Sequence, residues 1–424
     1  MGYRTLYYTV LGFGLGKNLA QEEGYAIITA TLDTLVEGVR DEVVWWRRHL
    51  HRNPELSFHE EETAQFVYET LRAFGNDLEL SRPTKTSVVA RLVGAKPGRT
   101  LAIRADMDAL PIEEENDFEF VSRTPGVMHA CGHDGHTAIL LGTAKILSGM
   151  KEKINGEVRF LFQHAEELYP GGAQELVDVG VMDGVDLVIG THLWAPLEFG
   201  KIGVAYGTMM GSPDTFWITI VGKGGHGAMP YQTVDSIAIG AQVVTNLQHV
   251  VSRNIDPIDN VVVSVTKFTG GTTYNVIPGC VEMLGTVRTL DPEVRKRVPE
   301  IMERVVKGIT EAHGASYEFK YQFGYRPVVN DEEVTRAIEE TVREVFGEET
   351  LEMVRPNLGG EDFSALQQKA PGTFFWVGAG NEEKGITYPH HHPRFTIDED
   401  ALPYGMKMFV NATFKLLEER RGAE

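Results

Sequence analysis

Cysteine is scarce in this chain, with only Cys131 and Cys280 among 424 residues. Two cysteines cannot build a disulfide framework, so the sequence fits a reducing compartment, and we expect a cytoplasmic protein. Cys280 is expected to be a buried free thiol. Long apolar runs are also missing, because no stretch reaches the roughly 18 uncharged apolar residues of a membrane-spanning helix. We therefore expect no membrane as a partner.

Positive charge is in short supply as well. The chain has 40 Lys and Arg against 60 Asp and Glu, a net charge of -20. Such a chain repels phosphate backbones, which argues against nucleic acid as a partner. Hydrophobic residues make up 42% of the chain, enough for substantial cores, and its length predicts two domains.

The N-terminal residues stand apart from both predicted domains. Residues 5–16 form a short apolar run with faint similarity to the core of a signal peptide. The basic flank of this run is thin, and residues 17–23 offer no convincing cleavage site. We expect residues 1–35 to be an N-terminal extension upstream of the first domain, not an export signal.

Apolar periodicity predicts helices alternating with buried strands in both outer parts of the chain. The expected helices are residues 32–50, 59–74, 137–147, 331–346 and 402–417, and the expected strands are 87–93, 100–103, 158–163, 187–191 and 373–378. This alternation is typical of an α/β fold in which helices flank a sheet. Functional sites in such folds gather at the carboxyl ends of the strands.

The middle of the chain follows a different order. The expected strands are residues 215–221, 260–268, 279–289 and 317–322, and the expected helices are 235–251 and 293–313. The resulting β-α-β-β-α-β order is typical of a small α+β sandwich. Because α/β signals resume after it, we predict that a second domain, residues 211–324, is inserted into a discontinuous first domain, residues 36–210 and 325–424.

The run at residues 129–136, HACGHDGH, is the densest group of metal-binding side chains in the sequence. Thiolate, imidazole and carboxylate are the ligands that zinc and neighbouring divalent metals select. Cys131 and His133 are two residues apart, so in a loop their side chains can converge, and we expect both to bind metal. His129 and His136 are expected to support ligands instead. The spacing alone is not diagnostic, because no CxxC…CxxC pattern accompanies it.

Further polar side chains follow predicted strands. Glu166 and Glu167 come directly after one strand, where neighbouring side chains diverge. One carboxylate can then face a metal while the other serves as general base for a water, although a solvated acidic pair is the alternative. His192 ends another strand, and is as often structural as functional. Asp106 and Asp108 end a third, where either could orient a metal-binding imidazole.

The predicted second domain has polar landmarks of its own. Glycines surround His226 in residues 222–230, which permits close backbone approach to a ligand. Asn275 and Arg288 could hold a carboxylate or polarise a carbonyl, but a turn asparagine and a surface arginine explain them equally well. Near the C-terminus, residues 390–392 are three consecutive histidines, and their spacing does not decide which one would bind metal.

Seven motifs in this order resemble the aminoacylase, hippurate hydrolase and auxin-conjugate amidohydrolase family of the two-metal carboxypeptidase superfamily. The motifs are residues 104–111 (RADMDALP), 129–136 (HACGHDGH), 165–167 (AEE), 225–230 (GHGAMP), 275–278 (NVIP), 359–363 (GGEDF) and 391–393 (HHP). The similarity spans roughly residues 38–416. The resemblance implies a catalytic domain with a mixed sheet and two divalent metal ions, and an inserted lid domain that commonly mediates dimerisation.

The resemblance also implies a set of metal ligands. Cys131 would bridge the two metals, where many relatives use aspartate, and His133, Glu167, His192 and His391 would complete the set. Thiolate favours zinc, with manganese and cobalt as alternatives.

Roles in catalysis follow from the same resemblance. Glu166 would be the general base and then the proton donor to the leaving amine, and Asp108 would orient a ligand. His226 and Asn275 would polarise the scissile carbonyl or bind the substrate carboxylate. The lid of a partner subunit is one source of these two side chains. Arg288 is a further candidate for binding the substrate.

We therefore expect hydrolysis of the amide bond of an N-acyl amino acid or short peptide by a homodimer or homotetramer assembled through the lid. A catalytically silent metal-binding relative or scaffold of the same fold is the alternative, disfavoured because Glu166 and the ligands are present. A cysteine hydrolase using Cys131 would instead be insensitive to chelators. His164 departs from the family, which usually has proline there, and we expect it merely to pack.

Overall fold

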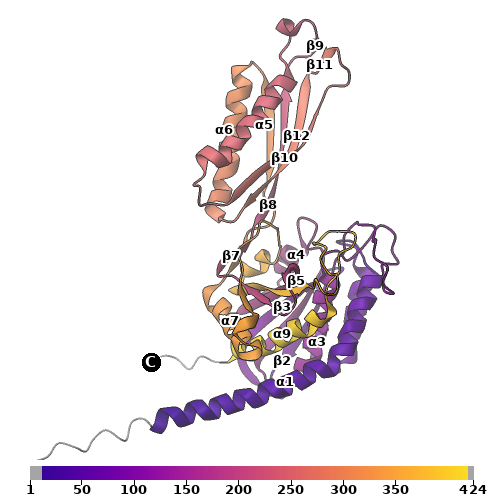
Figure 1. The fold of residues 1–424 in the computed structure, drawn as a ribbon, viewed down its shortest axis with the longest axis vertical. Coiled ribbons are helices and arrows are strands. Elements are labelled where there is room, and N and C mark those ends of the chain that lie inside the picture. Colours follow the sequence, from indigo (N-terminus) through magenta and orange to yellow (C-terminus); the bar gives the residue numbers. More distant parts are fainter. Residues whose placement is uncertain (1–11, 419–424) are drawn as a thin grey trace, which may run out of the picture.

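The computed structural model describes residues 12–418, with side chains from Leu32 onward. Figure 1 shows a larger body that holds both ends of the described chain and a slender second body built from its middle. The first part of the predicted N-terminal extension, residues 1–11, lies outside the described residues, and helix α1 (Gly12–Arg52) contains the rest. Within the described part, no helix is both long enough and apolar enough to cross a membrane.

An eight-stranded mixed sheet forms the centre of the larger body, in the order β1-β2-β4-β3-β5-β16-β6-β15. Four parallel neighbours make up its middle: β4 (Asn155–Gln163), β3 (Lys96–Asp106), β5 (Leu187–Glu198) and β16 (Gly372–Gly380). The edges are β1 (Leu78–Ser81) with β2 (Val88–Val93), and β6 (Ile202–Val204) with β15 (Leu351–Met353). The predicted α/β architecture is confirmed.

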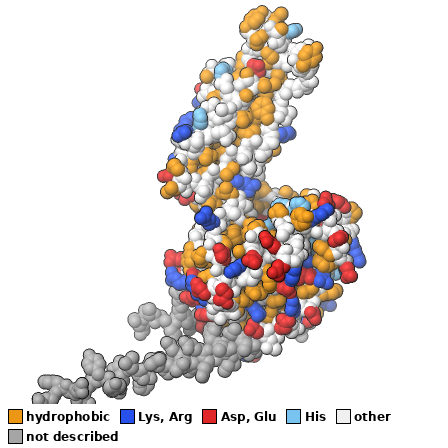
Figure 2. All heavy atoms as spheres, in the orientation of Figure 1, with side chains coloured by type: hydrophobic (Ala, Val, Ile, Leu, Met, Phe, Trp, Pro, Cys, Tyr) orange, Lys and Arg blue, Asp and Glu red, His pale blue; other side chains and the backbone are white. Residues whose placement is uncertain are grey.

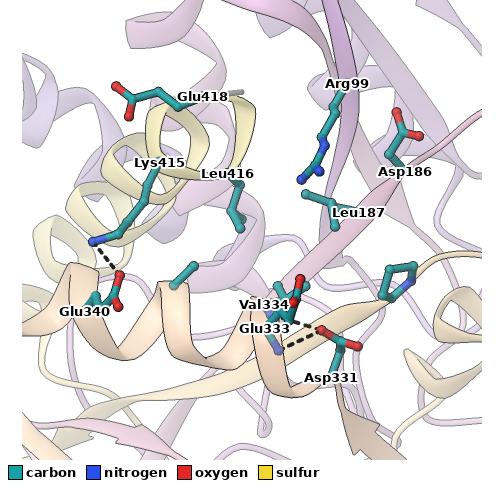
Figure 3. A pocket seen from close by; sticks show the side chains of 12 residues that line it. Arg99, Asp186, Leu187, Asp331, Glu333, Val334, Glu340, Lys415, Leu416 and Glu418 are labelled. Atoms are coloured by element: carbon teal, nitrogen blue, oxygen red, sulfur yellow. Dashed lines mark hydrogen bonds and ion pairs between the residues drawn. The ribbon is translucent and has the colours of Figure 1, made fainter. Parts of the chain in front are cut away.

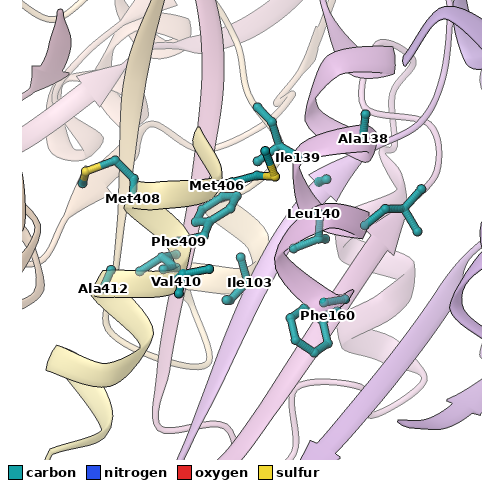
Figure 4. Close-up of a cluster of buried hydrophobic side chains, with 14 of the residues drawn as sticks. Ile103, Ala138, Ile139, Leu140, Phe160, Met406, Met408, Phe409, Val410 and Ala412 are labelled. Carbon is teal, nitrogen blue, oxygen red and sulfur yellow. The ribbon is translucent and has the colours of Figure 1, made fainter. Parts of the chain in front are cut away.

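Helices cover both faces of this sheet, which is why its strands are almost continuously apolar. One face carries α1, α2 (Glu61–Ala73), α3 (His133–Ser148), α7 (Glu332–Phe346) and α9 (Leu402–Leu417), and the other carries α4 (Gly172–Asp178) and α8 (Ser364–Gln367). Strand alternation divides β3 between the two cores, since Leu101 and Ile103 pack under the first group and Ala102 under the second. Figure 4 shows Ile103 and Phe160 of the sheet facing α3 and α9.

The second body, called the lid below, contains a four-stranded antiparallel sheet in the order β10-β12-β8-β13. Its elements in chain order are β8 (Ser212–Val221), α5 (Ser236–Asn254), β10 (Val261–Gly270), β12 (Cys280–Thr289), α6 (Pro292–Ala312) and β13 (Ser316–Gln322). This is the predicted β-α-β-β-α-β order. Asp235 and Asp291 cap the two helices by accepting backbone N–H groups, which explains where each helix begins.

A short antiparallel ladder joins the two bodies. It pairs β7 (Gly207–Met210), just before the lid, with β14 (Val328–Asn330), just after it. A second small ladder, β9 (Gly225–His226) with β11 (Val276–Ile277), lies at the far tip of the lid (Figure 1). These small strands were not predicted from the sequence, since two to four residues carry too little periodicity. The limits of the inserted domain, residues 211 and 324, stay a proposal.

One prediction about packing was wrong. Cys280 is exposed, not buried. It is the first residue of β12, where exposed and buried residues alternate, and the next residue, Val281, is the one that faces the lid core. The face of the strand on which Cys280 lies therefore decides whether its thiol is exposed. The sequence did not reveal which face the first residue of the strand would take.

Candidate metal centre

The predicted site residues lie at the carboxyl ends of the parallel strands. Asp108 follows β3, Glu166 and Glu167 follow β4, and His192 lies in β5. His391 belongs to the loop between β16 and α9. Because these strands are neighbours in the sheet, residues far apart in the sequence meet at one edge. In Figure 2, histidine side chains gather on the surface of the larger body beside the lid.

Two groups of potential ligands share one thiol. The ligand atoms of Cys131, His133 and His192 lie within 4.8 Å of one another, and so do those of Cys131, Glu167 and His391. Cys131 Sγ is 3.4 Å from His192 Nε2, and Glu167 Oε1 is 3.2 Å from His391 Nε2. The structure thus brings together all five side chains predicted to bind metal, and the thiol is the member common to both groups.

An unpartnered atom in these groups fits a bound cation. Within residues 32–418, His133 Nε2 is buried and makes no hydrogen bond. Leaving a buried polar atom unpaired costs free energy, so this nitrogen calls for a ligand. Burial and the carboxylates of Glu167 and Glu166 raise the pKa of the Cys131 thiol, an effect that a divalent cation would reverse by binding the thiolate. Sulfur, imidazole and carboxylate donors suit zinc and its neighbours.

Asp108 organises the centre without belonging to either ligand group. Its Oδ1 lies 3.2 Å from His133 Nδ1, and the carboxylate accepts the N–H groups of Glu166 and Glu167 at 3.1 and 3.0 Å. The Ser57 hydroxyl donates to Oδ2 at 2.7 Å. Although burial lowers the pKa of His133, Asp106 and Asp108 raise it to about 10. One carboxylate therefore orients an imidazole and also fixes the backbone of the acidic pair.

His136 and His129 lie outside the two ligand groups that share Cys131. Both ring nitrogens of His136 are in use: Nδ1 lies 2.6 Å from Asp106 Oδ1, and Nε2 accepts the Leu193 N–H at 2.8 Å. His136 also lies within 4.8 Å of the ligand atoms of Asp106 and His133, and its supporting role stays a prediction. His390 uses one ring nitrogen in the same way, since its Nε2 accepts the Ala195 N–H at 3.1 Å, whereas its buried Nδ1 makes no hydrogen bond.

Glu166 lies beside a buried charge network that sequence reasoning missed. Its carboxylate is within 4.8 Å of those of Glu361 and Asp362. The Arg104 guanidinium pairs with Asp106, Glu361 and Asp362 at 2.7, 2.9 and 2.8 Å. Burial and the carboxylates of Glu361 and Glu167 raise the pKa of Glu166. Arg104, Glu361 and Asp362 all belong to the motifs that carry the family resemblance. These motifs marked the three residues in the sequence but did not show that their side chains touch.

The candidate substrate-binding residues of the lid do not reach this centre. His226 and Asn275 are exposed and lie together at the lid tip, where the Gly227 N–H donates to the Asn275 carbonyl at 2.8 Å. Figure 1 places this tip far from the larger body. Arg288 lies at the other end of the lid and contacts the Leu358 carbonyl at 3.4 Å. The structure therefore separates His226 and Asn275 from the ligands of the same chain.

His164 packs as predicted but also has a polar partner. Its buried ring contacts Phe58 edge-on, and its Nε2 lies 2.7 Å from Glu175 Oε2.

A separate pocket, shown in Figure 3, lies at the opposite end of the sheet. Leu187, the first residue of β5, lines it together with Arg99, Asp331 and Leu416. None of the predicted site residues belongs to its lining. The chemistry is therefore expected at the carboxyl edge of the sheet.

Known proteins resemble this chain over most of its length. Residues 102–415 match the model of peptidase family M20/M25/M40. An N-acyl-L-amino acid amidohydrolase from Geobacillus stearothermophilus is 71% identical over 299 residues, covering 70% of this chain and 80% of the relative. Thermostable carboxypeptidase 2 from Saccharolobus solfataricus is 44% identical over 372 residues, covering 87% and 94%.

A solved structure has the same fold. The crystal structure of the Bacillus subtilis YXEP protein, a dinuclear metal-binding peptidase from family M20, superposes with a TM-score of 0.80 at 38% identity. The similarity covers 90% of this chain and 99% of that one. It therefore includes the lid as well as the larger body.

Proposed function

This chain belongs to peptidase family M20/M25/M40, and we propose that it cleaves the amide bond of N-acyl amino acids with Glu166 as general base. The predicted family and the predicted class, a hydrolase of amide or peptide bonds, are confirmed. The position of Glu166 carries the mechanistic proposal, because this buried carboxylate directly precedes the candidate ligand Glu167 and shares its anchor, Asp108.

We propose that the two ligand groups hold the two divalent ions of the family. His133 and His192 would bind one ion, Glu167 and His391 the other, and Cys131 both. When bound, such ions lower the pKa of water and polarise a carbonyl. Zinc is the proposed metal, since a thiolate bridge favours it over manganese or cobalt.

Glu166 would move the protons. It would accept one from the attacking water and return it to the leaving amine, as a general base that becomes a general acid. Burial and the neighbouring carboxylates raise the pKa of Glu166 above its ordinary value, which makes it a stronger base. Asp108 would keep the carboxylate in place through the Glu166 N–H, and His133 in place through Nδ1.

The lid tip would complete the site of another subunit. We propose a homodimer or homotetramer in which a partner's tip covers the centre, because His226 and Asn275 lie far from it within one chain. The imidazole would stabilise the developing oxyanion, and the amide would bind the substrate carboxylate. Arg288, near the base of the lid, remains a candidate for the same carboxylate.

A second candidate activity is carboxypeptidase cleavage of short peptides, favoured by the name of the relative that is 44% identical. Both substrates present an amide next to a free α-carboxylate, so one site could serve them.

The test is a panel of N-acyl amino acids, including N-acetyl-methionine and hippurate, beside dipeptides. Turnover would be measured before and after dialysis against a chelator, with metal content on the same samples. Activity that survives complete metal removal would contradict the proposal.

A further inference from the structure

The segment that returns from the lid to the larger body, residues 323–327, is held from both sides. On the lid side, the Gly324 N–H donates to Asp214 Oδ1 at 2.9 Å. On the other side, the Tyr325 hydroxyl donates to the main-chain carbonyl of Glu166 at 2.8 Å. Two adjacent residues therefore connect the lid to the loop that carries the proposed general base.

The lid end of this connection is rigid. Asp214 in β8 is buried and accepts hydrogen bonds from Arg295 Nε at 3.0 Å, from Arg295 Nη2 at 2.6 Å and from the Tyr321 hydroxyl at 2.9 Å. Arg295 Nη2 also donates to the Gly324 carbonyl at 2.8 Å. Charge-assisted hydrogen bonds to a buried carboxylate are costly to break. Gly324 must therefore move with the lid.

The loop after β4 is also tightly specified. Ala165 has a φ of +48°, which is unfavourable for a residue with a side chain, and its N–H donates to Glu60 Oε1 at 2.8 Å. The Glu166 N–H is bound by Asp108, so the Tyr325 hydroxyl satisfies the remaining backbone group of Glu166. The Tyr325 ring packs on Gly171, where a Cβ would lie 2.9 Å from Cε1. Burial and nearby carboxylates raise the pKa of Tyr325, so its hydroxyl stays a donor.

We propose that Tyr325 is a positioning residue that couples the orientation of the lid to the position of Glu166. Because Gly324 moves with the lid and Tyr325 follows it in the chain, a change in lid angle displaces the hydroxyl from the Glu166 carbonyl. When the lid is correctly placed, the Tyr325 hydroxyl donates to the Glu166 carbonyl and completes the hydrogen bonds of the strained loop. When the lid is misplaced, this hydrogen bond is lost. The proposal rests on the proposed role of Glu166.

The first test is Tyr325→Phe, which removes only the hydroxyl. We expect kcat to fall roughly 10- to 100-fold, since a displacement of about 1 Å at a reacting group costs that much. KM and metal content should stay near wild type, because no proposed ligand or substrate contact is lost. Hydrogen exchange over residues 164–171 should become faster. The matched control is Tyr317→Phe, which removes a hydroxyl from β13 that donates to the exposed Glu303 at 3.2 Å and should change none of these quantities.

A second variant separates coupling from local support. One glycine inserted between Gly324 and Tyr325 keeps the hydroxyl but loosens its link to the lid, so we expect kcat to fall as in Tyr325→Phe. Full kcat in the insertion variant would overturn the coupling and leave Tyr325 as a local support. Full kcat in metal-loaded Tyr325→Phe would overturn the proposal outright. Failure of the Glu166 assignment has a different signature, which is near-wild-type turnover in Glu166→Gln.

Discussion

Arg47 Nε of α1 donates to Asp134 Oδ2 of α3 at 2.8 Å, and each side chain is 1% exposed. Asp134 directly follows the proposed ligand His133, so this ion pair fixes the start of α3 against α1. His51 Nδ1 lies 2.8 Å from the same carboxylate oxygen. The N-terminal helix is thereby part of the frame that holds the metal centre.

Removing Arg47 should therefore destabilise the whole larger body. We expect Arg47→Met to lower the free energy of unfolding by about 3–5 kcal/mol, since it leaves the Asp134 carboxylate buried without its cation. The matched control is Arg48→Met, because Arg48 is 45% exposed and pairs with Glu399. Its loss should be at most about 1 kcal/mol. Denaturant titration of both metal-loaded variants measures the difference, and equal losses would refute this account.

Loss of the general base should abolish turnover and spare the metals. We expect Glu166→Gln to reduce kcat by roughly 10²–10⁴-fold, the usual contribution of a positioned base. Metal content should stay at wild-type level, because Glu166 belongs to neither group that contains Cys131. Steady-state kinetics and metal analysis on the same preparation check both statements. Near-wild-type turnover would show that another group takes the proton.

The two cysteines should respond differently to substitution. Cys131→Ala should lose bound metal and activity, because Cys131 belongs to both ligand groups. Cys280→Ala is the control, since Cys280 is exposed on the lid and should leave both quantities unchanged. Alkylation that inactivates the fully metal-loaded enzyme through Cys131 would instead support a cysteine hydrolase.

Mixing two inactive variants should restore activity if the lid tip acts on a partner subunit. His226→Ala removes the proposed oxyanion donor from the tip, and Glu166→Gln removes the base from the larger body. A mixed dimer would contain one site with both groups intact and one site with neither, so each mixed dimer should regain about half of the activity of a wild-type dimer. Activity that stays absent in verified mixed dimers would place His226 at the site of its own chain.

Acid should weaken the ion pairs that Glu157, near the start of β4 and away from the metal centre, makes with Arg91 and Arg159. The hydrogen bond from Arg91 lowers the pKa of Glu157, with a further contribution from Arg159. A lowered carboxyl pKa gives stability that is present above the ordinary value of 4.5 and is lost as the pH falls. We expect Glu157→Gln to cost about 1 kcal/mol near pH 7 and progressively less below about pH 4.5. A difference in unfolding free energy that does not change with pH would contradict this expectation.

Much of the site followed from the sequence because polar residues at the ends of parallel strands must meet at one edge of the sheet. That rule placed Glu166, Glu167 and His192 at the same edge, but their roles needed the family resemblance. The choice of His391 among three consecutive histidines needed the family resemblance. In the structure His391 has a φ of +65°, and nothing in the sequence indicates which of the three adopts this conformation. The Tyr325 contact joins residues 159 positions apart, and no periodicity connects them.

Tertiary packing accounts for the other gaps. The exposed face of Cys280 depends on strand phase at a boundary, where pattern reasoning is weakest. The ion pairs of Arg104 require β3 and the loop before α8 to be adjacent, which spacing along the chain does not show. The resemblance identified the motifs, and only the fold revealed which of their side chains touch.

The ladder of β7 and β14 has a consequence for how this architecture could have arisen. Val328 pairs with Met210, so the chain leaves for the lid and returns from it at neighbouring points of one small hairpin. Closing that hairpin with a short turn would leave the sheet of the larger body unbroken, since insertions are tolerated where chain ends lie close together. The lid is thus a module that could be exchanged or deleted by two cuts that are distant in the gene but side by side in the fold.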